Sequence, residues 1–125
     1  MMKKHVLIVD DEAAVLMAYK KLLCRADIEI HTAETIEDAE ECIAKQTFEV
    51  IISDLRLTGT SNLEGLEILR LVRERTLNTK VILMTAYGNA EIRERALKLG
   101  ASLYLEKPIL ADDLRRAIGS LEGKP

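Results

Sequence analysis

The chain has 125 residues, the length of a single domain with one sizeable core. Hydrophobic residues make up 48% and charged residues 31%, a globular composition that excludes disordered and collagen-like chains. The net charge of −3 offers no basic excess for nucleic acid, and no apolar run approaches the roughly 20 residues that span a bilayer. We therefore expect a small cytoplasmic domain with no membrane partner and no direct nucleic-acid binding.

Short apolar runs alternate with longer amphipathic stretches along the chain. Three of the runs are continuous and rich in β-branched residues, as in parallel strands buried on both faces, whereas two alternate with polar residues, as half-exposed edge strands do. In chain order we predict a strand at 6–9, a helix at 12–25, an edge strand at 28–32, a helix through 36–43, a strand at 50–52, a helix through 66–72, a strand at 81–84, a helix through 92–99, an edge strand at 103–106 and a helix through 110–121.

Two of these helices carry residues typical of helix ends. Thr35 is expected to be an N-cap, with Asp38 three residues on, and Gly100 is expected to follow the last turn of the fourth helix. Cys24 and Cys42 lie in predicted helices and match no metal-binding spacing, so we expect free buried thiols in a reducing compartment.

The order of the elements predicts an α/β fold, (βα)5 and doubly wound, with a five-stranded parallel sheet and helices on both faces. Burial of the first, third and fourth strands with edges at the second and fifth is satisfied by the order 2-1-3-4-5. We expect one domain over residues 1–125, with a core at 3–121 and a tail or the start of a linker at 122–125. Ligands of such sheets bind at the carboxyl ends of the strands, where the strand order reverses.

Polar side chains follow the strands at that edge of the predicted sheet. Asp10 and Asp11 follow the first strand, Asp54 the third, Thr85 the fourth and Lys107 the fifth. Carboxylates that converge repel one another, by on the order of 4 kcal/mol for two charges about 4 Å apart at an effective dielectric of about 20. A hard divalent cation such as Mg²⁺ suits them, and a carboxylate surrounded by metal, ammonium and hydroxyl suits phosphoryl transfer.

Four motifs in order resemble the receiver domain of bacterial two-component response regulators, and the resemblance covers nearly the whole chain. They are Val6-Leu7-Ile8-Val9-Asp10-Asp11-Glu12, Ile51-Ile52-Ser53-Asp54-Leu55-Arg56-Leu57, Val81-Ile82-Leu83-Met84-Thr85-Ala86-Tyr87-Gly88 and Gly100-Ala101-Ser102-Leu103-Tyr104-Leu105-Glu106-Lys107-Pro108. The resemblance implies a phosphoacceptor signalling switch that catalyses its own aspartyl phosphorylation and dephosphorylation and is no conventional turnover enzyme.

The resemblance also implies roles for the acids and the lysine. Asp54 would be the phosphoacceptor, served by a histidine kinase, a phosphotransfer protein or a small acyl phosphate. Asp11 and Asp54 would bind Mg²⁺ directly, the backbone carbonyl of Arg56 would complete the protein's share, and Asp10 would help through water. Lys107 would pair with the phosphoryl group.

Further roles concern the switch and the lifetime of the phosphoryl group. By the resemblance, Thr85 and Tyr104 would move on phosphorylation and remodel the face of the fourth helix, fifth strand and fifth helix. That face would serve an unknown output partner or domain, or a homodimer. Arg56 and Tyr87 would tune the phosphoryl lifetime, and the Lys107-Pro108 bond would be cis, which is uncommon.

The sequence departs from the family pattern after the acceptor. Thr58 and Asn62 stand where proline and glycine are common, and the glycine segment around Gly65 is displaced by three residues. The loop 58–62 is therefore predicted to be longer than usual. Loops tolerate insertions at little thermodynamic cost, so this bears on kinase docking and phosphoryl lifetime rather than on the fold.

Three other functions compete with this one. A haloacid-dehalogenase-type enzyme would place its second aspartate where Arg56 stands, and a flavin- or nucleotide-binding domain would need a phosphate-cradling loop where Asp10 and Asp11 stand. A degenerate receiver acting as a phosphorylation-independent interaction module is the main alternative. Tyr104 also fits a half-buried edge-strand aromatic with no switch role, and His5 and His31 are assigned no role.

Overall fold

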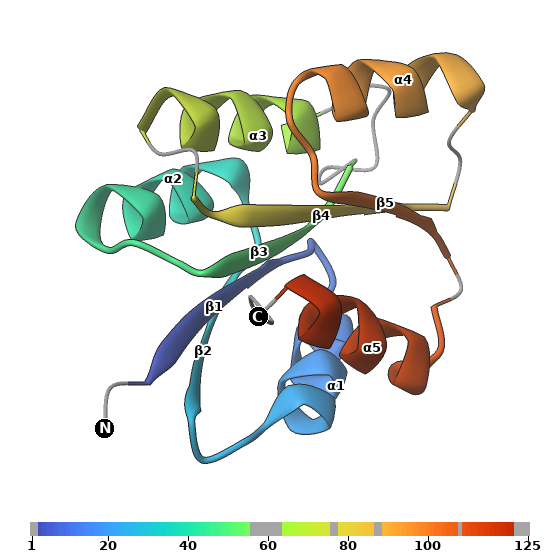
Figure 1. The fold of residues 1–125 in the computed structure, drawn as a ribbon. Helices are drawn as coiled ribbons and strands as arrows, with labels where there is room; N and C mark the ends of the chain where they lie inside the picture. The colour runs from blue at the N-terminus through green and yellow to red at the C-terminus, as the bar shows by residue number, and fades with distance from the viewer. Residues whose placement is uncertain (1–2, 56–63, 76–77, 87–88, 108, 122–125) are drawn as a thin grey trace.

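The computed structural model describes residues 3–55, 64–75, 78–86, 89–107 and 109–121, apart from the side chains of residues 111, 120 and 121. Strands and helices alternate along this chain (Figure 1). In order they are β1 (Lys4–Val9), α1 (Ala13–Leu23), β2 (Ile28–Ala33), α2 (Ile36–Lys45), β3 (Val50–Asp54), α3 (Glu64–Arg75), β4 (Lys80–Thr85), α4 (Ala90–Lys98), β5 (Leu103–Glu106) and α5 (Ala111–Leu121).

The strands form one five-stranded sheet in the order β2-β1-β3-β4-β5, and every neighbouring pair is parallel. The predicted fold class and strand order are therefore confirmed. The pairing Val9 to Ser53 and Asp54 to Met84 brings the carboxyl ends of β1, β3 and β4 to one edge. The division into a core at 3–121 and a tail or linker at 122–125 stays a prediction, because residues 122–125 lie outside the described residues.

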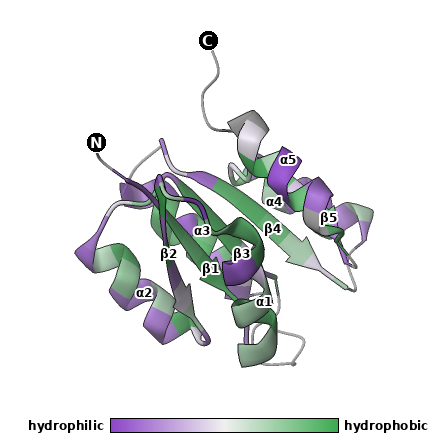
Figure 2. Cartoon of the chain, turned by 90° about the horizontal axis from the view of Figure 1, so that it is seen from below, coloured by the Kyte–Doolittle hydropathy of each residue, from purple (hydrophilic) through white to green (hydrophobic). Residues whose placement is uncertain are grey.

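Two apolar layers cover the sheet, one on each face (Figure 1). Alternate residues of β1 separate them: Leu7 and Val9 pack with residues of α2, α3 and α4, whereas Val6 and Ile8 pack with residues of α1 and α5. Figure 2 shows mainly hydrophobic residues along the central strands β1, β3 and β4, and alternating hydrophobic and hydrophilic residues along α2 and α5. Full burial of each such side chain contributes roughly 1.5–3 kcal/mol, so the two layers hold the strand ends in place.

The edge strands are less buried than the central ones, as predicted. In β2, residues 29 to 32 are half-buried or exposed, and in β5 the half-buried residues are Leu103, Tyr104 and Leu105. In contrast, Ile51, Ile52, Val81 and Ile82 of β3 and β4 are at most 1% exposed.

The helix ends follow the expected chemistry with small shifts in their bounds. The Thr35 side chain accepts a hydrogen bond from the Asp38 amide, and Gly100 adopts a positive φ of 106° after α4. The first helix runs from 13 to 23 rather than from 12 to 25, and the fifth begins at 111 rather than 110. Both stay within the first or last turn, where helix bounds are least sharply defined.

The expectation of two buried helical thiols is wrong for Cys24. This residue is exposed and follows the end of α1 in an extended conformation, whereas Cys42 is half-buried in α2. Both thiols are free, as expected. Burial raises the pKa of the Cys42 thiol, which lowers its reactivity. Among the described residues, no helix is long and apolar enough to cross a bilayer.

Gly65, in the first turn of α3, lies directly against the backbone that carries Asp54. A β-carbon there would lie 2.8 Å from the Asp54 carbonyl oxygen and 2.8 Å from Leu55 Cα. The Gly65 amide also donates a hydrogen bond to the Leu55 carbonyl at 2.9 Å. This close approach needs a residue without a side chain, so α3 and the end of β3 are fixed to each other.

We expect Gly65→Ala to lower the free energy of unfolding by about 1–3 kcal/mol, because the added methyl overpacks against backbone that cannot move aside. The matched control is Gly119→Ala in α5, where a β-carbon would have nothing within 4 Å. That change should raise stability by about 0.5–1 kcal/mol through helix propensity. Chemical denaturation measures both, and equal effects of the two substitutions would contradict the close approach.

Candidate functional site

Backbone hydrogen bonds fix the residues that follow the strands. The Asp10 amide donates to the Ala33 carbonyl at 3.1 Å, and the Lys107 amide donates to the Thr85 carbonyl at 2.8 Å. The Leu55 amide, next to Asp54, donates to the Met84 carbonyl at 2.8 Å. The ladder therefore continues past the strands and sets the start of each functional side chain.

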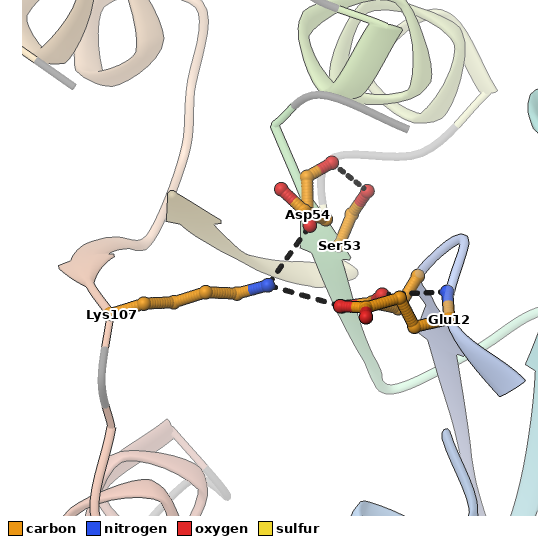
Figure 3. A network of polar contacts seen from close by, with 5 residues as sticks. Glu12, Ser53, Asp54 and Lys107 are labelled. Carbon is orange, nitrogen blue, oxygen red and sulfur yellow. Dashed lines mark hydrogen bonds and ion pairs between the residues drawn. The ribbon is translucent and has the colours of Figure 1, made fainter. Parts of the chain in front are cut away.

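Lys107 joins the first and third strands through its side chain (Figure 3). Its Nζ donates to Asp54 Oδ2 at 2.9 Å and to Asp10 Oδ2 at 3.2 Å. The Asp10 side chain is fully buried and that of Asp54 is 13% exposed, so the ammonium of Lys107 offsets two carboxylates that water solvates poorly. Asp10, Asp54 and Lys107, predicted from three separate motifs, are thus brought together.

Opposing effects act on the pKa of Lys107. Burial alone lowers this pKa, but the hydrogen bond and negative charge of Asp54, together with those of Asp10, outweigh burial and raise it. Lys107 is therefore held as an ammonium at physiological pH, ready to pair with an anion.

Asp10, Asp11 and Glu12 form an acidic cluster at the start of α1. One carboxylate oxygen from each lies within 4.8 Å of the others. Asp10 Oδ1 accepts a hydrogen bond from the Glu12 amide at 3.0 Å, so both oxygens of Asp10 have protein partners, whereas Asp11 and Glu12 are exposed. Oxygen-only clusters of this kind suit Mg²⁺, which retains several waters.

The predicted switch residues lie on one face of the sheet, in β4 and β5. Thr85 ends β4 and is 1% exposed, and Tyr104 is half-buried in β5 opposite Leu83, two residues before Thr85. Tyr104 and Leu83 pack in the layer under α4, and alternation along β4 directs Thr85 to the same side.

Comparison with known proteins identifies the family. The sequence profile described as "Response regulator receiver domain" matches residues 6–119. The chain belongs to this family. Receiver domains are signalling switches of two-component systems that interact with histidine kinases or phosphotransfer proteins and with output domains, and they are generally Mg²⁺-dependent.

Individual relatives agree with this. The response regulator protein PilR of Pseudomonas aeruginosa is 31% identical over 120 residues, which is 96% of this chain and 26% of PilR. The sporulation initiation phosphotransferase F of Bacillus subtilis is 27% identical and is covered over 93% of its length. The crystal structure of the signal receiver domain of a putative Luxo repressor protein from Vibrio parahaemolyticus superposes with a TM-score of 0.86 at 30% identity, covering 96% of this chain and 90% of that one.

The receiver spans about a quarter of the length of the first curated relatives that it matches. The activities of those longer proteins are therefore not properties of this domain alone. The family assignment does exclude the haloacid-dehalogenase and nucleotide-binding interpretations of the sequence.

Several predicted site residues lie outside the described residues. They are Arg56, Tyr87 and Pro108, together with the loop 58–62. The metal-binding carbonyl of Arg56, the lifetime roles of Arg56 and Tyr87, and the cis bond between Lys107 and Pro108 therefore remain predictions.

Sequence reasoning did not identify Tyr19 as part of the site. Tyr19 and Glu12 of the α1 region line a hollow of about 410 Å³ with Lys107 and Ile109. Burial raises the pKa of the Tyr19 hydroxyl, Lys107 lowers it, and Asp10 and Asp54 raise it further. The sequence did offer one indication: Tyr19 lies seven residues, or two helical turns, after Glu12, so both residues are expected on the same face of the helix.

We expect Lys107→Met to lower the free energy of unfolding by about 1–3 kcal/mol without divalent cations, because Asp10 and Asp54 lose the cation they share. Adding Asp54→Asn should recover at least about 1 kcal/mol, since one of the facing charges is then gone. The control is Lys45→Met, whose exposed pair with Glu41 should be worth less than about 1 kcal/mol. Urea denaturation measures all of these, and a Lys107→Met effect no larger than that of Lys45→Met would contradict the shared-cation interpretation.

Proposed function

We propose that Asp54 is the residue of this receiver that accepts the phosphoryl group, from a histidine kinase, a phosphotransfer protein or a small acyl phosphate. The observation that carries the proposal is the pair of contacts from Lys107 Nζ to Asp54 and Asp10. A phosphoryl acceptor must be ionised and reachable from solvent. The Asp54 side chain, at the carboxyl end of β3, is 13% exposed, whereas that of Asp10 is fully buried, so Asp54 is the better acceptor of the two.

In the transfer, an Asp54 carboxylate oxygen attacks phosphorus in line with the leaving group. A P–O bond forms to Asp54 as the bond from phosphorus to the donor's nitrogen or oxygen breaks, and the donor atom keeps that electron pair. Lys107 then pairs with the phosphoryl oxygens as its contact with the Asp54 carboxylate is replaced. The buried Asp10 keeps Lys107 aligned throughout.

The residues present fit Mg²⁺ at this site. Asp11 and Asp54 would hold the ion directly with the backbone carbonyl of Arg56, and Asp10, whose oxygens are both hydrogen-bonded, would act through water. When bound, the ion supplies compensation for the negative charge that gathers on the transferring group. Without it, the acids of this edge repel an incoming phosphate.

We further propose that phosphorylation moves Thr85 and Tyr104 and so changes the face formed by α4, β5 and α5. Thr85 would donate its hydroxyl to a phosphoryl oxygen, and half-buried Tyr104, on the same side of the sheet, would follow inward. Reversing a two-state equilibrium from 1:99 to 99:1 needs roughly 5.5 kcal/mol, of which new bonds to Thr85 and Lys107 would supply part. An output partner or domain, or a second copy of the receiver, would bind this face.

This function gives the receiver a place in a phosphorylation chain rather than a turnover reaction. It would catalyse only its own phosphorylation and dephosphorylation, and it would act in the cytoplasm. The alternative, an interaction module independent of phosphorylation, is disfavoured because Asp10, Asp54 and Lys107 are all present and in contact.

We expect incubation of the receiver with acetyl phosphate and Mg²⁺ to add one phosphoryl group, seen by intact-protein mass spectrometry. The adduct should be absent without Mg²⁺ and absent from Asp54→Ala. Asp27→Asn, which changes an exposed aspartate paired with Arg25, should behave as wild type. A folded wild-type protein that gains no mass would instead support the interaction module.

The same sample separates chemistry from switching. Thr85→Ala should still gain the phosphoryl group, whereas the amide NMR shifts of α4, β5 and α5 that follow phosphorylation should largely vanish. Equal shifts in wild type and Thr85→Ala would remove Thr85 from the switch.

Arg56 and Tyr87 stand two residues after the acceptor and after Thr85, and we propose that these bulky side chains slow the loss of phosphate by limiting water access. Arg56→Asn and Tyr87→Ala should therefore each raise the dephosphorylation rate, measured as decay of the adduct after the donor is removed. Unchanged rates in both variants would end this proposal, while the acceptor role of Asp54 would stand.

A further inference from the structure

Two histidines and a glutamate gather where β1 pairs with β2, away from the site at the carboxyl ends of the strands. His5 is the second residue of β1 and pairs with Glu29, and His31 is two residues further along β2. Asp54 lies at the opposite end of its strand. The cluster is therefore separate from the phosphorylation site.

The ligand atoms of this cluster are spaced as in a metal site. His5 Nδ1 lies 3.4 Å from His31 Nε2, which lies 3.2 Å from Glu29 Oε2. One ligand atom from each of the three residues lies within 4.8 Å of the other two. Zinc bound tetrahedrally at about 2.0–2.1 Å from nitrogen keeps neighbouring ligand atoms about 3.3–3.4 Å apart. Both short separations are close to this tetrahedral edge.

Within the cluster, one proton on His31 Nε2 cannot make straight hydrogen bonds to both of its neighbours. A proton on His31 Nε2 can point at Glu29 or at His5 Nδ1, so one of the two acceptors receives at most a bent, shared bond. Protonating both rings would place two positive charges next to each other. One cation between the three atoms would accept a lone pair from each of them at once.

The surroundings hold the rings in position. The His31 ring meets the buried Phe48 ring edge-on, with centroids 5.3 Å apart and an interplanar angle of 80°. The His5 amide donates to Glu49 Oε1 at 2.7 Å, and the β1–β2 ladder fixes the backbone on both sides. Ligands held by neighbouring strands need little ordering when an ion binds.

We propose that His5 Nδ1, His31 Nε2 and the Glu29 carboxylate bind a zinc ion, with water as the fourth ligand. Imidazole nitrogens select zinc-like ions over Mg²⁺, which prefers oxygen, so the two metal sites of the receiver differ in chemistry. The His31 and Glu29 side chains are 28% and 48% exposed, so an ion can enter from solvent. The bound ion ties the edge strand β2 to β1 and stabilises the fold independently of phosphorylation.

The test is calorimetric titration of the untagged chain with Zn²⁺ in excess Mg²⁺, with the melting temperature as a second readout. We expect one ion per chain and a melting temperature raised by at least about 5 °C at saturation. His5→Gln and His31→Gln should each weaken binding by at least about 100-fold, because losing a ligand costs more than the 10–100-fold typical of its supporting contacts. Glu29→Gln should weaken it at least about 10-fold.

Two control variants test whether zinc binds elsewhere on the chain. Cys24→Ser removes the exposed thiol, and Asp11→Asn alters the acidic cluster, and neither should change zinc affinity. No zinc binding by the folded wild-type chain, undiminished binding by His31→Gln, or loss in either control would overturn the proposal. Circular dichroism in chelator checks that His31→Gln is folded. If His31→Gln is unfolded, zinc binding by Glu29→Gln, which changes a partly exposed side chain, decides between the outcomes.

Discussion

The central interaction of this receiver is the pair of contacts that the Lys107 ammonium makes with two carboxylates, those of Asp10 and Asp54. Asp10 and Asp54 come from neighbouring parallel strands, and the sheet brings them to the same edge. Two unit charges about 4 Å apart repel by on the order of 4 kcal/mol at an effective dielectric of about 20. Lys107 follows β5, which lies two strands from β3 and three from β1, and it relieves this repulsion by contacting both carboxylates. Lys107 compensates the two negative charges in the absence of a ligand. A bound cation or a phosphoryl group on Asp54 would change this charge balance and so alter the contacts of Lys107.

The rest of the fold keeps these three side chains in place. Gly65 lets α3 approach the Asp54 backbone closely. Hydrogen bonds donated by the backbone amides of Leu55 and Lys107 continue the sheet ladder beyond β3 and β5. Apolar layers on both faces of the sheet then prevent the strand ends from separating to relieve the charge. The packed core therefore holds the charged side chains in fixed positions before any ligand arrives. Such preorganisation is a general requirement for electrostatic control of a reaction.

The sequence predicts the fold and the main site residues because each depends on local patterns. Continuous apolar runs at 6–9 and 81–84 indicate buried strands, and once the strand order follows, Asp10, Asp54 and Lys107 must lie at one edge. Features that depend on three-dimensional detail were not predictable in this way. The exposure of Cys24 depends on where α1 ends, Tyr19 approaches Lys107 through helix packing, and the cluster of His5, Glu29 and His31 depends on the register of β1 against β2.

We propose that the carboxylate of Asp54, and no other acid at the carboxyl ends of the strands, carries the phosphoryl group. The most direct test of this assignment is borohydride reduction of the phosphorylated receiver, which converts an aspartyl phosphate to homoserine, followed by peptide mass mapping. We expect homoserine at position 54 and unmodified aspartate at positions 10 and 11. Homoserine at Asp10 or Asp11, with Asp54 unmodified, would contradict the assignment of roles around Lys107.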